Sequence, residues 1–446
     1  MDTDQNHRFI HTKYVDEAGA WYSLDNAGII MPAVTGDVST GMFRIEITLS
    51  GAIDPETMKK ALGETANRFP YFNVTLKRGF FWYYLDQSNT SPPLFLDDGS
   101  PCQLWNINRP GTRMFRIRIA KNRVAGEFSH ALTDGSGGMS FMKTLIVRYF
   151  ILKGIDPGAE LGTGDFTDIL SLDSQPEMDE YEDGYQKYFP GKLPNPEPNP
   201  EAWHIRWPRL PEGGYRITQG SIDLGEVIRE AKKRGVSLTE LLGAVYLDVL
   251  QALWFAEPRR PKEHFICVEI PVNLRQFFPT RTNRNFSLFI LLRENLHLGK
   301  RDFDELTKRA HYQMRLENDP RSLARQIARN AGGTRNLFVR MVPLVLKDVA
   351  ARILFAKLGE TMLSGFISNI GAVKMPPGIC PHIESFGFVP APSETTLTNA
   401  SVLSWNDKLI LSFGSLARSR ELEKLYFRKL RSLGLAVSVR CRDDEE

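Results

Sequence analysis

The chain has 446 residues, of which 42% are hydrophobic and 24% are charged, and its formal net charge is +3. This length exceeds what one hydrophobic core usually organises, so two domains are expected. The nearly balanced charge excludes a protein whose main partner is nucleic acid, because such proteins carry a strong basic excess on one face.

The cysteines and the N-terminus indicate a soluble, cytoplasmic protein. The four cysteines form no CxxC pair and show no metal-ligand spacing with the eight histidines, which predicts reduced thiols. The N-terminal stretch MDTDQNHRFIHTKY lacks the apolar core of a signal peptide. No apolar run approaches the roughly 20 residues that are needed to cross a bilayer.

Residues 1–170 are expected to form a first domain. Apolar residues alternate over 43–50, which predicts a half-buried strand, and Asp54 then caps a helix that starts at Pro55. The other elements expected in this domain are two hairpins over 71–87 and 114–130, and a helix from about Gly138 to Leu152.

Residues 171–213 are rich in proline, glycine and acidic residues and show no period, which predicts a crossover linker. Residues 214–446 begin again with a strand and a helix, and Ser237 with Glu240 forms a capping box. Strands are then expected over 264–274, 285–292, 364–371, 396–405 and 408–415, and a mostly helical stretch is expected over 336–358. The recurring strand–helix order predicts two similar α/β sandwich domains.

The stretch EFSHALTDGSGG, residues 127–138, places a histidine at the end of a predicted strand and an acid four residues later. His130 ends the strand face that Val124, Gly126 and Phe128 form. A lone histidine there is usually a packed core residue, but the glycine-rich turn that follows permits close backbone approach. A strand end would hold the imidazole rigidly toward a cleft, as a general base requires.

His130, Asp134 and Gly135 match an HxxxDG motif, and the segment resembles the coenzyme-A-dependent acyltransferase superfamily. That group includes chloramphenicol acetyltransferases, alcohol acetyltransferases, plant BAHD acyltransferases and the condensation domains of peptide synthetases. The context matches as well, because a strand precedes the motif and a helix follows it. The resemblance implies an α/β (α+β) fold of two chloramphenicol-acetyltransferase-like sandwich domains, with the active site at their interface.

Two later segments extend the resemblance over nearly the whole chain. IPVNLR, which ends at Arg275, and the following RNF resemble an element in which an arginine pairs with the motif aspartate. FISNIG, which contains Ser368 and Asn369, resembles the strand that precedes the family's exchange of strands between domains. That exchange is expected here near residues 364–405.

The resemblance implies an O-acyltransferase of the alcohol-acetyltransferase kind, with no metal and no bound cofactor. Acyl-CoA would be the donor co-substrate, and His130 would take the proton of a small alcohol or amine acceptor. Asp134 and Arg275 would form a structural ion pair beside Gly135. Ser368 or Asn369 would donate to the oxyanion. A monomer suffices, because one chain builds both sides of the interdomain site.

Three other interpretations stay open. A non-catalytic binding or scaffold protein can share the fold without the activity. A condensation-like enzyme would use carrier-protein thioesters, but Ser129 stands where condensation domains usually have a first histidine, and no carrier-protein segment is present. His130 and Asp134 could share a metal on one helix face, although the turn glycines argue against a helix there and no third ligand is evident.

Residues 336–358, NLFVRMVPLVLKDVAARILFAKL, are apolar with four basic residues interspersed. Such a segment fits a lipid interface, so membrane contact is possible. Pro343 and Asp348 interrupt the segment, and a pair of core helices that line an acyl tunnel is therefore favoured.

Overall fold

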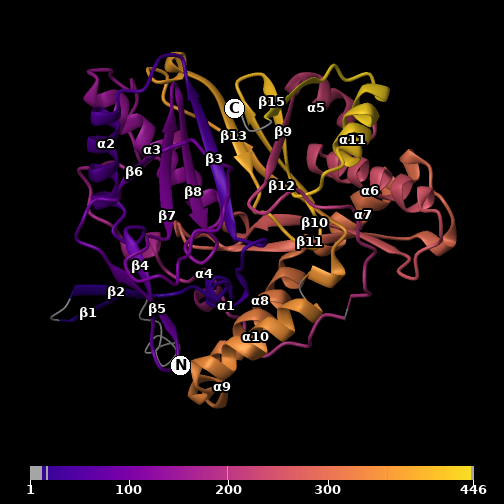
Figure 1. Cartoon of the computed structure of the whole chain (residues 1–446), viewed down its shortest axis with the longest axis horizontal. Coiled ribbons are helices and arrows are strands. Elements are labelled where there is room, and N and C mark those ends of the chain that lie inside the picture. The colour runs from indigo at the N-terminus through magenta and orange to yellow at the C-terminus, as the bar shows by residue number, and fades with distance from the viewer. Residues whose placement is uncertain (1–12, 17–18, 198, 359, 443–446) are drawn as a thin grey trace.

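The computed structural model of the chain describes residues 13–16, 19–197, 199–358 and 360–442. These residues form three β-sheets and a set of α-helices, and two large hydrophobic clusters hold them together. Figure 1 shows the two larger sheets side by side, with helices on their outer faces.

The first large sheet has the strand order β13-β3-β8-β7-β6, and all its pairs are antiparallel except β6 with β7. Its strands are β3 (Met42–Leu49), β6 (Leu94–Leu96), β7 (Phe115–Ala120), β8 (Arg123–Ser129) and β13 (Ile383–Val389). Helices α2 (Pro55–Arg68) and α3 (Gly135–Leu152) cover one face. Asp54 caps α2 as predicted, because its side chain accepts from the backbone N–H of Thr57 at 3.2 Å.

The second large sheet has the order β11-β10-β12-β14-β15-β9-β16. Its strands are β9 (Arg216–Asp223), β10 (Phe265–Asn273), β11 (Ser287–Asn295), β12 (Gly365–Ala372), β14 (Thr398–Trp405), β15 (Lys408–Ser415) and β16 (Ser438–Arg442). The helices that pack with it are α5 (Leu224–Lys233), α6 (Leu238–Ala256), α7 (Phe303–Glu317) and α11 (Glu421–Ser432). The predicted capping box of Ser237 and Glu240 starts α6.

Helix α6 is long and apolar enough to cross a membrane by length and composition alone. Its 19 residues form the central core helix of the second half, and 67% of its most apolar stretch is buried inside the protein. A core helix of a large domain meets the same criteria, because it is apolar on all sides.

The remaining elements are a small sheet and several short or peripheral helices. The small sheet has the order β1-β2-β5-β4, with β1 (Lys13–Asp16), β2 (Gly19–Ser23), β4 (Val74–Arg78) and β5 (Tyr83–Gln87). The α-helices are α1 (Met31–Val34), α4 (Gly184–Lys187), α8 (Pro320–Arg335), α9 (Leu337–Met341) and α10 (Leu344–Leu358). The 3-10 turns are η2 (Gly28–Ile30), η3 (Gly164–Phe166), η4 (Met178–Glu180), η5 (Leu274–Gln276), η6 (Leu296–Leu298), η7 (Glu360–Met362) and η8 (Cys380–His382).

Strand β13 joins the first sheet although the strands before and after it in sequence, β12 and β14, belong to the second. It lies antiparallel to β3, with Phe386 opposite Ile47. Residues 364–405 therefore divide their strands between the two sheets and tie the halves of the chain together.

The segment 171–213 crosses between the two halves, but its first part is packed into the protein. Glu180 of η4 is 1% exposed and accepts from both Arg68 Nη atoms, at 2.8 and 2.7 Å, and from the Tyr71 hydroxyl at 2.9 Å. Its carbonyl accepts from the backbone N–H of Asn283 at 2.7 Å. The crossover thus supplies a buried acid that joins α2 to the second half.

The prediction of a core helix pair over 336–358 is wrong. Large apolar side chains of α9 and α10 point to solvent, and Phe338 and Met341 are 85% and 72% exposed. The periodicity of the sequence did not predict this exposure, because α10 lies against the protein through the face that carries Asp348.

A buried ionic cluster lies on the sheet face opposite α3. Glu127 of β8 is fully buried, and its Oε1 accepts from Arg44 Nη1 at 2.8 Å and from the backbone N–H of Cys102 at 3.0 Å. Burial alone would raise the pKa of Glu127, but Arg44, Arg116 and Arg118 hold it below its usual range. Cys102, whose backbone N–H donates to Glu127, packs in the hydrophobic cluster of the second half. The ionic cluster therefore lies where the two halves of the chain meet.

The variant Glu127→Gln is expected to lower the free energy of unfolding by about 3 kcal/mol, because it removes the only carboxylate paired with Arg116 in the described part of the chain and leaves the buried cluster with an excess of guanidinium groups over carboxylates. Urea unfolding followed by tryptophan fluorescence measures this. Glu64→Gln is the matched control: it removes the partly exposed pair with Arg148 and should cost less than about 1 kcal/mol. Equal losses in the two variants would contradict the assignment.

Candidate active site

His130 directly follows β8, where its backbone N–H donates to the Gly41 carbonyl at 2.9 Å. Its ring lies against Phe43 of β3, with the ring centroids 4.7 Å apart. Ser129 and Ala131 on either side are 1% and 0% exposed, whereas His130 keeps part of its surface accessible. The strand end therefore holds the imidazole in place, and the residue is not fully enclosed.

Burial lowers the pKa of His130 below 6.5. The Asp134 carboxylate, the Asn285 side chain and the Thr133 backbone act in the opposite direction but do not outweigh it. The imidazole is therefore neutral at pH 7, and a neutral imidazole has a nitrogen lone pair that accepts a proton.

Asp134 caps helix α3: its Oδ1 accepts from the backbone N–H groups of Ser136 at 3.2 Å and Gly137 at 3.1 Å. The helix begins at Gly135, so the predicted start near Gly138 is wrong. Glycines weaken a helix, but an aspartate at the N-cap satisfies the free N–H groups of the first turn and stabilises it there.

Arg275 of η5 meets the same carboxylate. Its Nη1 lies 2.9 Å from Oδ2 of Asp134 and its Nη2 lies 3.2 Å from Oδ1, while the backbone N–H of Phe286 donates to Oδ2 at 2.9 Å. The carbonyls of Thr282 and Arg284 accept from Nε at 2.8 Å and from Nη2 at 2.6 Å. Both oxygens of Asp134 are thus committed to donors from both halves of the chain.

The glycines of this turn allow backbone contact with the second half. A Cβ on Gly137 would lie 2.1 Å from the Asn283 carbonyl oxygen, and a Cβ on Gly135 would lie 2.8 Å from Ile370 Cδ1. Thr133 completes the contact by donating its hydroxyl to the Asn283 carbonyl at 2.6 Å. Any side chain at Gly137 would push the motif away from the residues that hold it.

Asn285 holds the backbone carbonyl of His130 by a hydrogen bond, and Asp25 holds Asn285. The sequence analysis predicted a role for neither residue. The Asn285 side-chain amide donates to the His130 carbonyl at 2.9 Å and to the Asp25 carboxylate at 2.9 Å. Asp25 also accepts from the backbone N–H of Gly28 at 2.7 Å. The RNF stretch pointed toward Asn285, but nothing local marks Asp25, which lies 260 positions away from it in the chain.

Buried charges gather around this support. Arg284 is 1% exposed, lies over the Tyr22 ring at 5.6 Å, and its guanidinium has no hydrogen-bond partner among the residues that the structure describes. Burial raises the pKa of Asp25 to about 6, although Arg284 and hydrogen bonds oppose the shift. Burial and the nearby Asp25 raise the pKa of Asp183 to about 7. Such groups are costly to bury and mark a polar network inside the protein.

Ser368 and Asn369 of β12 lie on opposite faces of their strand. The Asn369 amide donates to Thr239 Oγ1 at 2.9 Å, and its oxygen accepts from the backbone N–H of Gly371 at 2.9 Å. Asn369 is therefore engaged with α6 and its own strand. Ser368 is 7% exposed, and Ile370, which lies at a β-bulge between Asn369 and Gly371, lies against the HxxxDG turn.

The alternative of a metal shared by His130 and Asp134 lacks a third ligand. Over the described ranges of the chain, no three His, Cys, Asp or Glu side chains are grouped so that they could hold a metal ion. The Asp134 carboxylate is directed at Arg275, in the geometry of an ion pair.

The variant Arg275→Ala is expected to lower the free energy of unfolding by about 3 kcal/mol or more, because it leaves the buried Asp134 carboxylate without its cation. Arg275→Lys should recover only part of this, since an ammonium cannot donate along both oxygens. Urea unfolding measures both variants. The control Arg281→Ala removes a largely exposed pair with Glu177 and should change little. An Arg275→Ala variant as stable as the unmodified protein would contradict the structural role of the pair.

No protein-family model matches the chain, and no curated protein matches its sequence. Solved structures do match. The trichothecene 15-O-acetyltransferase TRI3 from Fusarium sporotrichioides has a TM-score of 0.57 at 11% identity, over 95% of this chain and 97% of that one. TRI101 of F. sporotrichioides, complexed with coenzyme A and T-2, has a TM-score of 0.56 at 12% identity, over 93% and 98%.

A variant of the starter condensation domain of rhizomide synthetase RzmA, in complex with C8-CoA and Leu-SNAC, has a TM-score of 0.55 at 14% identity, over 93% of each chain. These likenesses cover nearly the full length of both proteins, and they confirm the predicted fold class. The chain has the mixed α/β, two-domain fold of condensation domains and trichothecene acetyltransferases.

Proposed function

We propose that the protein is an acyltransferase that moves an acyl group from an acyl-CoA thioester to an alcohol or amine, with His130 as the general base. One observation carries the proposal: a neutral, partly accessible imidazole stands at the end of β8, beside a carboxylate–guanidinium pair that joins the two halves. The fold supports it, because proteins of this fold include an O-acetyltransferase and complexes with coenzyme A.

In the proposed reaction the imidazole of His130 takes the proton of the acceptor hydroxyl or amine as the acceptor attacks the thioester carbonyl. The tetrahedral intermediate then collapses, the carbon–sulfur bond breaks, and the CoA thiolate leaves. The imidazolium returns the proton to that thiolate, so the free base is regenerated. Acceptor and thioester are consumed, and ester or amide and free thiol are formed.

Asp134 has a positioning role in this proposal. Its two oxygens already accept five hydrogen bonds, so it has no free site for a travelling proton. It fixes the turn after His130, and Gly135 lets that turn lie against Ile370. For the oxyanion, Ser368 is the better candidate, because the Asn369 amide is held by Thr239.

A second candidate is a condensation-like enzyme that takes its acyl group from a carrier-protein thioester. The likeness to a starter condensation domain favours it. Incubation with acyl-CoA and a panel of alcohols and amines, with free thiol as the readout, separates the candidates. Thiol release that depends on the acceptor supports the proposal, whereas turnover only with carrier-bound thioesters favours the second candidate. No turnover with either donor favours a binding or scaffold protein.

The variant His130→Ala is expected to lower kcat/KM by at least about 10²-fold, because general-base catalysis contributes about 10²–10⁴. The far-UV circular dichroism and the unfolding midpoint should stay close to those of the unmodified protein, since His130 forms no ion pair with the residues that the structure describes. His297→Ala, at an exposed histidine, is the matched control and should keep full activity. Near-normal turnover by His130→Ala would remove this residue from the mechanism.

The pH dependence follows from the sign of the His130 shift. Because its pKa is lowered, the active neutral form is present above pH 6.5 and is lost as the pH falls through a value below 6.5. In a pH profile measured at constant salt concentration and temperature, kcat/KM should therefore fall on the acid side with a midpoint below pH 6.5. A midpoint above pH 6.5 would contradict a buried, neutral base.

A further inference from the structure

Helix α10 presents its apolar side to solvent and its acid to the protein. Val345, Val349 and Ile353 follow one another at helical spacing and are 60%, 51% and 54% exposed. Asp348 between them is 9% exposed, and it accepts from Tyr83 at 2.9 Å and from Arg78 at 3.2 Å. A helix on the surface of a water-soluble protein normally has the opposite arrangement.

The tip of the β4–β5 hairpin continues the same surface. The Phe80 carbonyl accepts from the backbone N–H of Leu344 at 2.9 Å, and the Phe81 carbonyl accepts from Lys347 Nζ at 3.0 Å. The Lys347 ammonium also lies 3.5 Å from the centroid of the Trp82 ring. Hairpin tip, α9 and α10 are thus joined, and we call residues 80–81 with 338–354 the α9–α10 surface.

This surface gathers most of the exposed apolar side chains in the described part of the chain. Ten of the 19 large apolar side chains that are exposed there belong to residues 80–81 and 338–354. Figure 1 shows α9 and α10 at the lower end of the molecule, beyond the two large sheets. An exposed apolar cluster of this kind marks a contact with a partner or a lipid.

The helices that carry this surface, and the helix before them, are mostly basic. Helices α8 to α10, residues 320–358, contain eight basic residues and one acid, Asp348, although the whole chain has a net charge of only +3. Arg321 and Arg329 of α8 and Arg340 of α9 are exposed. The partner should therefore be both apolar and negatively charged.

We propose that the α9–α10 surface docks on an anionic lipid bilayer. Arg340 is exposed beside the exposed Val339 and Met341. The Lys347 ammonium is instead held by the Phe81 and Arg340 carbonyls and the Trp82 ring. A protein partner would have to desolvate those charges, which is costly. In a lipid headgroup layer the apolar side chains reach the acyl chains while the cations contact phosphates, so both kinds of group are satisfied.

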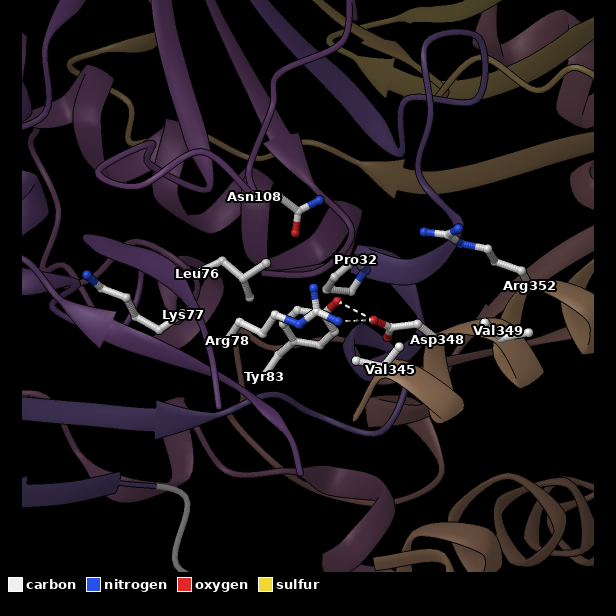
Figure 2. A pocket seen from close by; sticks show the side chains of 10 residues that line it. All are labelled: Pro32, Leu76, Lys77, Arg78, Tyr83, Asn108, Val345, Asp348, Val349 and Arg352. Atoms are coloured by element: carbon white, nitrogen blue, oxygen red, sulfur yellow. Dashed lines mark hydrogen bonds and ion pairs between the residues drawn. The ribbon is translucent and has the colours of Figure 1, made fainter. Parts of the chain in front are cut away.

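A cavity adjoins this surface, and Asp348, the one acid of α10, lies in its wall beside Val345 and Val349. The cavity has a volume of about 410 Å³ and lies between α10, the β4–β5 hairpin and Pro32 of α1. Figure 2 shows Arg78 and Tyr83 directed at Asp348 along its wall. Because Asp348 is paired with Arg78 there, its charge opposes a negative membrane less. The proposal concerns binding and does not rest on the proposed acyl transfer.

Flotation of the full-length protein with vesicles tests the proposal. Vesicles of phosphatidylcholine with about 30 mol% phosphatidylglycerol should carry the protein at least about tenfold more strongly than pure phosphatidylcholine. Raising the salt from about 0.1 M to about 1 M, which shortens the Debye length from about 10 to about 3 Å, should weaken the binding. Equal binding to both kinds of vesicle, or none to the anionic one, would overturn the proposal.

Two sets of variants locate the contact. Phe338→Ser with Leu346→Ser and Ile353→Ser should reduce binding to anionic vesicles by at least about tenfold, because these exposed side chains supply the inserted area. The matched control is Leu298→Ser with Leu316→Ser, at side chains that are 70% and 74% exposed elsewhere, and it should bind normally. All the substitutions are at exposed positions, so the unfolding midpoints should not change.

Two outcomes with these variants would overturn the lipid proposal. If the triple variant floats as well as the unmodified protein, the α9–α10 surface is not the contact. If the unmodified protein is instead a dimer that the triple variant converts to a monomer, and neither floats, the surface joins two copies of this chain and the lipid proposal is overturned. Light scattering on the same samples reports the oligomeric state.

Discussion

The Asp134 carboxylate is the point on which the arrangement around His130 depends. It accepts hydrogen bonds from the first turn of α3 and from Arg275 and Phe286 of the second half. A single buried carboxylate thereby starts a helix, ends the turn after β8 and joins two parts of the chain 141 residues apart. Gly137 packs against the Asn283 carbonyl at this point because it has no Cβ.

The rest of the site follows from that joint. With Asp134 committed to Arg275, burial is the dominant influence on His130 and keeps its imidazole neutral. Asn285 then donates to the His130 carbonyl and to Asp25, so the backbone that carries the imidazole is held by Asn285 and Asp25. Among the described residues the Arg284 guanidinium has no hydrogen-bond partner, and burial raises the pKa values of Asp25 and Asp183, so this polar interior is costly.

The distribution of charge modifies what the composition suggests. A net charge of +3 argues against an extended basic face, yet residues 320–358 alone contain eight basic residues and one acid. The remainder of the chain is therefore slightly acidic, and the positive charge is concentrated beside exposed apolar side chains. Composition averages over the whole chain, whereas a surface is recognised by the groups that lie side by side on it.

The sequence by itself determined what depends on near neighbours. The caps of α2 and α6, the hairpins of β4–β5 and β7–β8, and the histidine at the end of β8 follow from residues a few positions apart. Tertiary structure decided the rest: the exposure of the apolar side chains of α10 and the support of His130 by Asp25. Each of these depends on contacts between distant parts of the chain, and local periodicity carries no information about such partners.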